Sequence, residues 1–135
     1  MRVLVTGGTG FVGSQLVAAL VGRGDRVRVL RRASSSLLAL EGLSNIEHII
    51  GDILESEAVA QAVLGCDLVF HVAALSSYWR AQREQIYRIN VEGTRAVLEA
   101  LLGIQTAFAR TPKYAIGGMK MKIGDDKLLN PAQDH

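Results

Sequence analysis

The glycine-rich segment near the start of the chain is 6–13, Thr6-Gly7-Gly8-Thr9-Gly10-Phe11-Val12-Gly13. It follows Arg2-Val3-Leu4-Val5-Thr6, a short run rich in β-branched residues that predicts a buried strand. After it, apolar residues recur at helical spacing over 11–21, and Gly22 and Gly24 end the pattern. A strand, a glycine turn and a helix in this order predict the opening βα unit of an α/β fold.

Three glycines of this segment are expected to serve a bound dinucleotide in different ways. Gly7 allows the tight turn, Gly10 lets the backbone approach a pyrophosphate, and Gly13 lets the helix pack close to the strand. The N–H groups and the dipole at the start of the helix then favour the phosphate charge. We therefore expect cofactor contacts from Gly7, Gly10, Phe11, Val12 and Gly13. The alternative is a glycine-rich turn that binds no ligand.

Strands and helices alternate along residues 1–102. Further strands are expected at 26–30, 46–50 and 67–72, and further helices at 34–43, 57–64 and 83–102. This alternation predicts the α/β class, with a Rossmann-type doubly wound parallel sheet covered by helices on both faces. Because only about four parallel strands are recognisable, we expect a truncated sheet followed by an irregular C-terminal tail.

Two arginines follow the second predicted strand, where an NAD site would carry an acidic residue for the ribose hydroxyls. A guanidinium binds a 2′-phosphate through charge-assisted hydrogen bonds, whereas a carboxylate would repel it. Arg31 and Arg32 therefore predict NADP as the cofactor, with NAD as the alternative. The other interpretation is that both arginines are solvated surface residues.

Composition excludes several other classes of protein. The 135 residues carry a net charge of +2, which is too small to indicate nucleic acid or a membrane surface as a partner. The single cysteine, Cys66, excludes an internal disulfide and a multi-cysteine metal site, and we expect no metal. The apolar runs are too short to cross a membrane. We expect a cytoplasmic protein in a reducing compartment.

The basic residues change type along the chain. Residues 1–102 contain ten Arg and no Lys, whereas 103–135 contain one Arg, four Lys and both prolines. This break predicts two parts, a partial NAD(P)-binding Rossmann domain over 1–102 and a tail of different origin over 103–135. We expect the tail to be partly disordered. A fusion inside the last predicted helix, near residues 94–100, and a naturally divergent tail both account for the break.

Four motifs, in order and correctly spaced, resemble the extended short-chain dehydrogenase/reductases. They are Thr6-Gly7-x-x-Gly10-x-x-Gly13, Gly51-Asp52, His71-Val72-Ala73-Ala74 and Asn90-Val91-Glu92-Gly93-Thr94. The stretch is most similar to the branch of NAD(P)-dependent epimerase/dehydratases and dihydroflavonol-reductase-like proteins. The similarity covers residues 1 to about 100.

The resemblance implies roles for five further residues. Asp52 and Ile53 would contact the adenine, and Ala73 and Ala74 would line the dinucleotide near its riboses. Asn90 would help to hold the fourth strand and its helix in register. The residue types leave simpler interpretations open, because an aspartate often caps a turn or a helix and small alanines often just pack.

Proton transfer in this family uses a Tyr-x-x-x-Lys pair, and this sequence contains none. Its tyrosines are followed four residues later by Gln82, Val91 and Gly118. His71 stands within an apolar run and is interpreted as a core histidine rather than a proton carrier. We therefore assign no catalytic residue in this chain.

The leading hypothesis is an NAD(P)-binding domain of an oxidoreductase or epimerase/dehydratase that lacks the catalytic pair. Three alternatives remain: an enzyme whose proton donor lies elsewhere, such as Tyr114 or a residue of a partner chain, an NADP-sensing or interaction module without turnover, and a non-functional fusion fragment. Without later strands, 67–72 would form a sheet edge and favour self-association. Residues 106–109 or 113–116 are the candidates to cover that edge instead.

Overall fold

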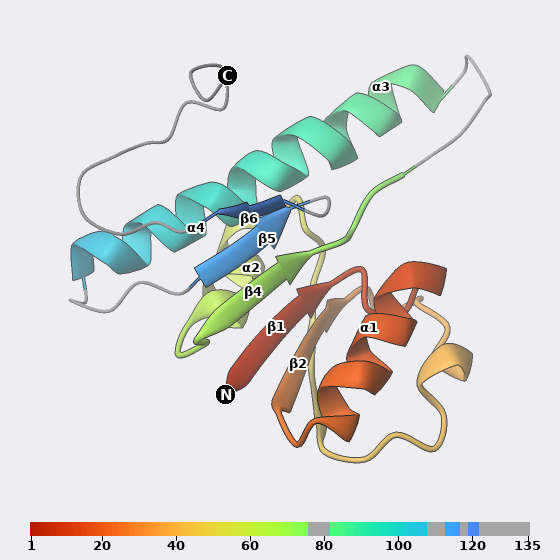
Figure 1. Ribbon diagram of the computed structural model, residues 1–135. Coiled ribbons are helices and arrows are strands. Elements are labelled where there is room, and N and C mark those ends of the chain that lie inside the picture. Colours follow the sequence, from red (N-terminus) through yellow and green to blue (C-terminus); the bar gives the residue numbers. More distant parts are fainter. Residues whose placement is uncertain (76–81, 108–112, 117–118, 122–135) are drawn as a thin grey trace, which may run out of the picture.

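The computed structural model describes residues 1–75, 82–107, 113–116 and 119–121, and the side chains of 1–75 and 82–103. In this part of the chain six strands form one sheet in the order β3-β2-β1-β4-β5-β6 (Figure 1). The strands are β1 (Arg2–Thr6), β2 (Arg26–Arg31), β3 (Ile46–Ile50), β4 (Leu68–His71), β5 (Lys113–Ile116) and β6 (Met119–Met121). Neighbouring strands from β3 to β5 are parallel, and β6 is antiparallel to β5.

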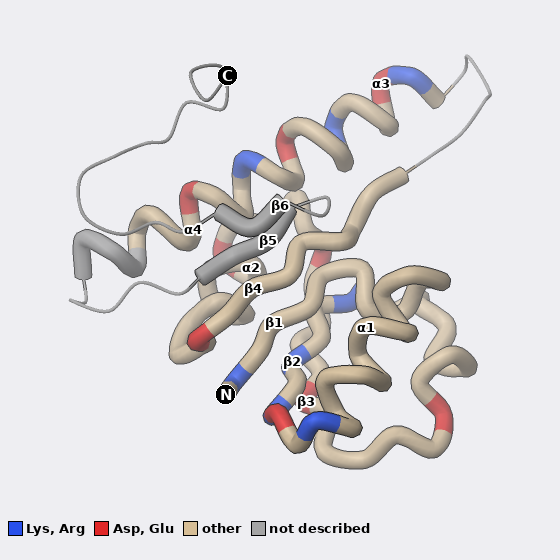
Figure 2. Tube along the Cα trace, in the orientation of Figure 1, with Lys and Arg blue, Asp and Glu red and all other residues tan. Residues whose placement is uncertain are grey.

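Helices cover both faces of the sheet, which confirms the doubly wound α/β prediction (Figure 1). On one face lie α1 (Phe11–Gly22) and the short 3-10 helix η1 (Leu38–Leu40). On the other lie α2 (Ser56–Val63) and the end of a long helix. That helix consists of α3 (Arg83–Tyr87), the π-helical segment η3 (Arg88–Glu92) and α4 (Gly93–Ala107). Basic and acidic residues are interspersed along it (Figure 2).

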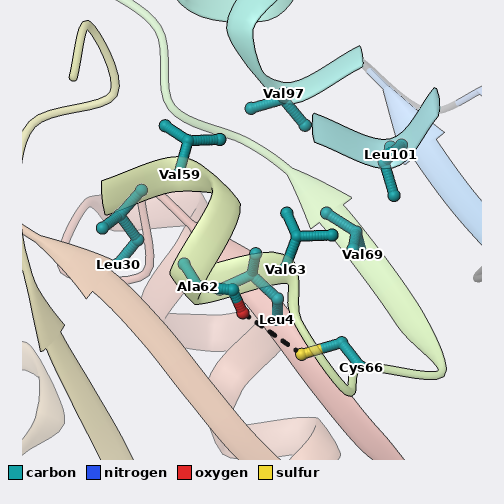
Figure 3. Packing of buried hydrophobic residues seen from close by; sticks show 9 residues of the cluster. All are labelled: Leu4, Leu30, Val59, Ala62, Val63, Cys66, Val69, Val97 and Leu101. Atoms are coloured by element: carbon teal, nitrogen blue, oxygen red, sulfur yellow. Dashed lines mark hydrogen bonds between the residues drawn. The ribbon is translucent and has the colours of Figure 1, made fainter. Parts of the chain in front are cut away.

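Alternate residues of β1 supply the two hydrophobic cores. Leu4 faces α2 and α4 and is buried with Val59, Val69 and Val97 (Figure 3). Val3 and Val5 face the opposite way, against α1 and η1. Both sets are inaccessible to solvent, and each such side chain contributes roughly 1.5–3 kcal/mol to folding. β1 is therefore held from both faces, and the loop that follows it starts from a rigid strand.

Cys66 belongs to the core on the α2 side. Its thiol is buried and donates a hydrogen bond to the carbonyl of Ala62 at 3.4 Å (Figure 3). Burial raises the pKa of this thiol. The cysteine is thus a small buried side chain, as its position beside an apolar strand indicates.

Two expectations from the sequence need correction. The predicted sheet edge at 67–72 is wrong, because β5 pairs with β4, from Leu68 opposite Lys113 to His71 opposite Ile116. Cover by 113–116, the alternative, is confirmed. Among the described residues, β5 thus joins the four parallel strands that the sequence predicted. The helix expected over 34–43 is reduced to the single turn of η1, since this serine-rich stretch buries little besides Leu40.

The end of the long helix bears on the predicted tail. The helix continues to Ala107, so the proposed boundary after Leu102 falls inside it. Within 103–135, the described residues form the end of α4 and strands β5 and β6, and this part is not irregular. The rest of the predicted tail, 108–112, 117–118 and 122–135, lies outside the described residues. The division of the chain into two parts stays a prediction.

Candidate functional site

The strand order reverses at β1, which has β2 on one side and β4 on the other. The helices that follow β1 and β4 accordingly lie on opposite faces of the sheet, and doubly wound folds bind their ligands at the carboxyl edge beside such a reversal. The glycine loop 7–10 lies at this edge, between the end of β1 and the start of α1. The ends of β2, β3 and β4 carry the other predicted site residues.

Gly7 lies at a tight turn where the neighbouring backbone leaves no room for a side chain. Its φ angle is +71°, in the left-handed region that favours glycine. A Cβ on Gly7 would lie 2.6 Å from the backbone nitrogen of Ala73, in the segment that follows β4. The predicted tight turn is confirmed, and the structure adds a reason for it: the loop lies directly against the backbone after β4.

Gly13 lets α1 approach the same loop. A Cβ at this position would lie 2.0 Å from the carbonyl oxygen of Gly7, so the absence of a side chain lets the helix pack closely on the loop that follows β1. Gly10 is exposed, and its own Cβ would meet only the Gly7 oxygen at 3.4 Å. The loop is thus closed towards the protein and open towards solvent at Gly10.

The start of α1 is suited to an anion. Gly10 is the N-cap residue, and no side chain caps the N–H groups of the first turn. The first turn also contains no acidic residue that would neutralise its partial positive charge. The N–H groups of a first helical turn have no partners within the helix and carry a partial positive charge. Phe11 and Val12 are 87% and 64% exposed, unusual values for apolar residues, and offer contact surface beside those N–H groups.

Arg31 and Arg32 lie at the carboxyl end of β2, next to the end of β1 in the sheet. The Arg31 Nε donates to Nδ1 of His48 at 3.1 Å, and Arg32 is exposed. Desolvation, with help from the Arg31 charge, lowers the pKa of His48 and keeps it available as an acceptor. Among the described residues neither arginine forms an ion pair, so both guanidinium groups retain donors for a ligand.

Asp52 and Ile53 follow β3 and are partly engaged by the protein itself. The Asp52 carboxylate accepts the N–H of Leu54 at 2.9 Å, which is the turn role left open by its residue type. Ile53 is half-buried and packs against Gly93, where a Cβ would lie 3.0 Å from its side chain. Contact of either residue with an adenine stays a prediction.

Asn90 clamps the segment after β4 to the long helix. Its side-chain Oδ1 accepts the N–H of Leu75 at 2.8 Å, and its Nδ2 donates to the Leu75 carbonyl at 2.9 Å. These bonds confirm the positioning role that the resemblance implied, and direct contact with a cofactor stays a prediction. Ala73 and Ala74 lie between this clamp and the end of β4, with Ala73 against Gly7 and Ala74 exposed.

A series of hydrogen bonds through the buried His71 joins β1, β4 and α4, and two of the residues involved, Thr6 and Thr94, were not predicted as site residues. His71 Nδ1 lies 2.7 Å from the Thr6 hydroxyl, and its Nε2 lies 2.9 Å from the Thr94 hydroxyl. Both threonines stand inside the quoted motifs, and Thr94 comes four residues after Asn90 on the same helix. The spacing of Asn90 and Thr94 could have indicated that the two residues lie on the same side of the helix. No comparable signal links Thr6 to His71, because they are far apart in sequence.

Some candidates lie beyond what the structure describes. Of the tyrosines, Tyr78 falls outside the described residues, and of Tyr114 only the backbone is described, paired with Val69 in the sheet. Within the described part of the chain, no group of three or more His, Cys, Asp or Glu could hold a metal ion. No helix in that part is long and apolar enough to cross a membrane.

A doubly wound sheet with a glycine loop at its reversal point defines the class as a Rossmann-type α/β protein. The chain belongs to the 3-beta hydroxysteroid dehydrogenase/isomerase family, whose family model matches residues 4–108. The predicted kinship with extended short-chain dehydrogenase/reductases is thereby confirmed. The match also reaches past Leu102, to the end of α4.

Individual relatives cover most of this chain. A 3-beta-hydroxysteroid dehydrogenase of Mycolicibacterium neoaurum is 38% identical over 136 residues, 94% of this chain and 36% of that protein. The 4-hydroxy-2-methyl-3-oxo-4-farnesyl-3,4-dihydroquinoline-1-oxide ketoreductase of Stigmatella aurantiaca is 41% identical over 100 residues, 74% of this chain and 29% of that protein.

A solved short-chain dehydrogenase/reductase superfamily protein from Agrobacterium tumefaciens, with bound NAD, superposes with a TM-score of 0.66 at 31% identity. The match covers 86% of this chain and 32% of that one. The chain spans about a third of the length of the curated relatives it matches. An alignment that covers 94% of 135 residues includes part of 103–135, so the similarity extends into the predicted tail.

Proposed function

We propose that this chain is the dinucleotide-binding part of an NAD(P)-dependent oxidoreductase or epimerase/dehydratase. The observation that carries the proposal is the cradle formed by the glycine loop, where a Cβ on Gly7 or Gly13 would collide with backbone. Such a loop brings main-chain N–H groups close to a pyrophosphate without side chains between them. Gly7, Gly10, Phe11, Val12 and Gly13 would hold the phosphates.

The preferred cofactor in this proposal is NADP. The two arginines at the end of β2 lie one strand away from the glycine loop and have donors to spare. In the fold class, this is the place of the adenosine ribose, and a 2′-phosphate there would accept charge-assisted hydrogen bonds. The bound NAD of the Agrobacterium tumefaciens neighbour supports the class of cofactor rather than the choice between the two.

Turnover by this chain is not part of the proposal. Bound nicotinamide supplies hydride chemistry, and the reacting proton then needs a positioned acid or base. No tyrosine of the 135 residues has a lysine four positions later. The described residues at the carboxyl edge instead position main-chain donors, two guanidinium groups and small alanines, which suit binding.

Titration of the whole chain with NADPH and with NADH tests this proposal. NADPH is expected to bind more tightly, and replacing Arg31 and Arg32 by serine should weaken NADPH about tenfold, the effect of one lost charge-assisted hydrogen bond, while leaving NADH unchanged. Isothermal calorimetry measures both affinities directly. Equal loss for both cofactors would contradict the 2′-phosphate role, and failure of the unaltered chain to bind either would overturn the function.

A further inference from the structure

The geometry determines which groups donate and which accept in the hydrogen bonds between Thr6, His71 and Thr94. The Thr94 hydroxyl lies 2.6 Å from the carbonyl oxygen of Asn90, which can only accept, so the hydroxyl proton points there. Thr94 must then accept from the His71 Nε2 at 2.9 Å. The proton of a neutral His71 ring is therefore on Nε2.

The other ring nitrogen continues the chain into β1. With the proton on Nε2, Nδ1 is an acceptor, and the Thr6 hydroxyl donates to it at 2.7 Å. The Thr6 oxygen in turn accepts the backbone N–H of Val72 at 3.2 Å and of Ala73 at 3.3 Å. Every member has its partners, and no buried side-chain polar atom in the described part of the chain is left without one.

These hydrogen bonds end at two residues that hold the segment after β4, one beside the glycine loop and one on the long helix. Ala73 is the residue whose backbone lies against Gly7, at a distance that excludes any side chain there. Asn90, whose carbonyl closes the other end of the chain, is the residue that clamps Leu75. The π-helical segment Arg88–Glu92 contains Asn90 and ends just before α4 begins at Gly93. Such local departures from the α-helix often accompany functional positions.

We propose that His71 is a positioning residue for the dinucleotide: as a neutral ring with its proton on Nε2, it links β1, β4 and α4 and thereby holds the 72–75 backbone against the glycine loop. Burial lowers the pKa of His71, which favours this neutral form. His71 acts through Thr6 and Thr94 and touches no reacting atom. The inference rests on the proposed function, because its effect is on cofactor affinity.

The tautomer is measured first, on the unaltered 135-residue chain. Nitrogen-15 NMR of the imidazole rings at neutral pH distinguishes a protonated from a free ring nitrogen, and a His71→Asn variant identifies the signals among the three histidines. A neutral ring with the proton on Nε2 is expected. A charged ring, or a proton on Nδ1, would overturn the proposal, whatever the variants do.

Affinity for NADPH is then compared in a matched pair of variants. Thr94→Val keeps the shape but removes the acceptor of His71, and we expect at least about fivefold weaker binding, the equivalent of one lost hydrogen bond. Thr94→Ser keeps the hydroxyl and should bind within about twofold of the unaltered chain, since the bond is retained. Calorimetry gives the affinities, and circular dichroism gives the melting temperatures.

A separate control distinguishes positioning from general destabilisation. Val63→Ala removes buried methyl groups of α2, on the core side away from the glycine loop, and should lower the melting temperature without changing NADPH affinity. If Thr94→Val lowers only the melting temperature, as Val63→Ala does, His71 stabilises the fold and the proposal is wrong. If the unaltered chain binds neither NADPH nor NADH, the proposed function fails and the positioning role fails with it, even with the expected tautomer.

Discussion

The two edges of the sheet use their polar groups in opposite ways. At the amino edge, the charges are paired within the protein: the Asp25 carboxylate accepts from the Met1 ammonium at 3.1 Å and from Arg23 at 2.7 Å. At the carboxyl edge, the side chains of Thr6, His71 and Thr94 hydrogen-bond to one another, with Thr6 and His71 buried and Thr94 partly buried. Arg31 and Arg32 at this edge have no ion-pair partner among the described residues.

Arg28 is the clearest case at the amino edge. Its guanidinium is buried, donates to the carbonyls of Ala62 and Leu64 at the end of α2, and pairs with Glu47 through two nitrogens. The Arg28 hydrogen bond lowers the pKa of Glu47. The comparison shows that charged groups at the amino edge are paired within the protein and stabilise the fold. At the carboxyl edge, main-chain and guanidinium donors are left available for a ligand.

The largest effect that separates the edges should come from Gly13→Ala. The new methyl would lie 2.0 Å from the Gly7 oxygen, so the loop must shift, and NADPH affinity should fall about a hundredfold. Gly22→Ala is the matched control on the same helix, because nothing lies within 4 Å of its Cβ. The control should bind normally. Equal NADPH affinity of the two variants in calorimetry would contradict the cradle.

Arg28→Met tests the opposite edge. The loss of the buried guanidinium leaves the carbonyls at the end of α2 without donors and should lower the free energy of unfolding by about 2–4 kcal/mol. Because these contacts lie at the amino edge, NADPH affinity of the folded fraction should not change. Urea unfolding and calorimetry on the same samples measure the two quantities. A loss of NADPH affinity that accompanies the loss of stability would contradict the proposal that the amino edge stabilises the fold and the carboxyl edge binds the ligand.

The smallest effect is a dependence of stability on pH. Burial lowers the pKa of His71, and the groups that face its ring among the described residues are the Thr6 and Thr94 hydroxyls. A histidine held neutral in the fold contributes stability above its unfolded pKa of about 6.5, and this stability falls as the pH drops below that value. The loss cannot exceed about 1.4 kcal/mol per pH unit for one proton.

Two other sets of groups have to be separated from His71 in that measurement. His48 also has a lowered pKa, so a His48→Asn variant serves as the background for the titration. Asp25 and Glu47 have lowered pKa values, and their contribution is lost only as the pH falls below the ordinary range of carboxyl groups. Urea unfolding at pH 7 and pH 5.5 should show the histidine effect alone. No change in stability between these two values would contradict a buried neutral His71.

Much of the fold was predictable because its signals are local. The strands β1 and β3 coincide with their predicted ranges, and α1 begins at Phe11, directly after Gly10, as predicted. The 34–43 helix failed because serines and surface leucines carry no tertiary partner to stabilise a helix there. Strand β5 could be named only as a candidate, since its pairing with β4 depends on residues more than forty positions away.

The sequence by itself determined the glycine loop, because Gly7 and Gly13 restrict a stretch of chain only a few residues long, where the absence of a Cβ decides the backbone path. Only the tertiary structure decided what surrounds that loop. Thr6 and His71 are 65 residues apart, and His71 and Thr94 are 23 apart. The parallel pairing of β1 and β4 places Thr6 beside His71, and the packing of α4 on the sheet places Thr94 beside the same ring. No local pattern encodes these contacts.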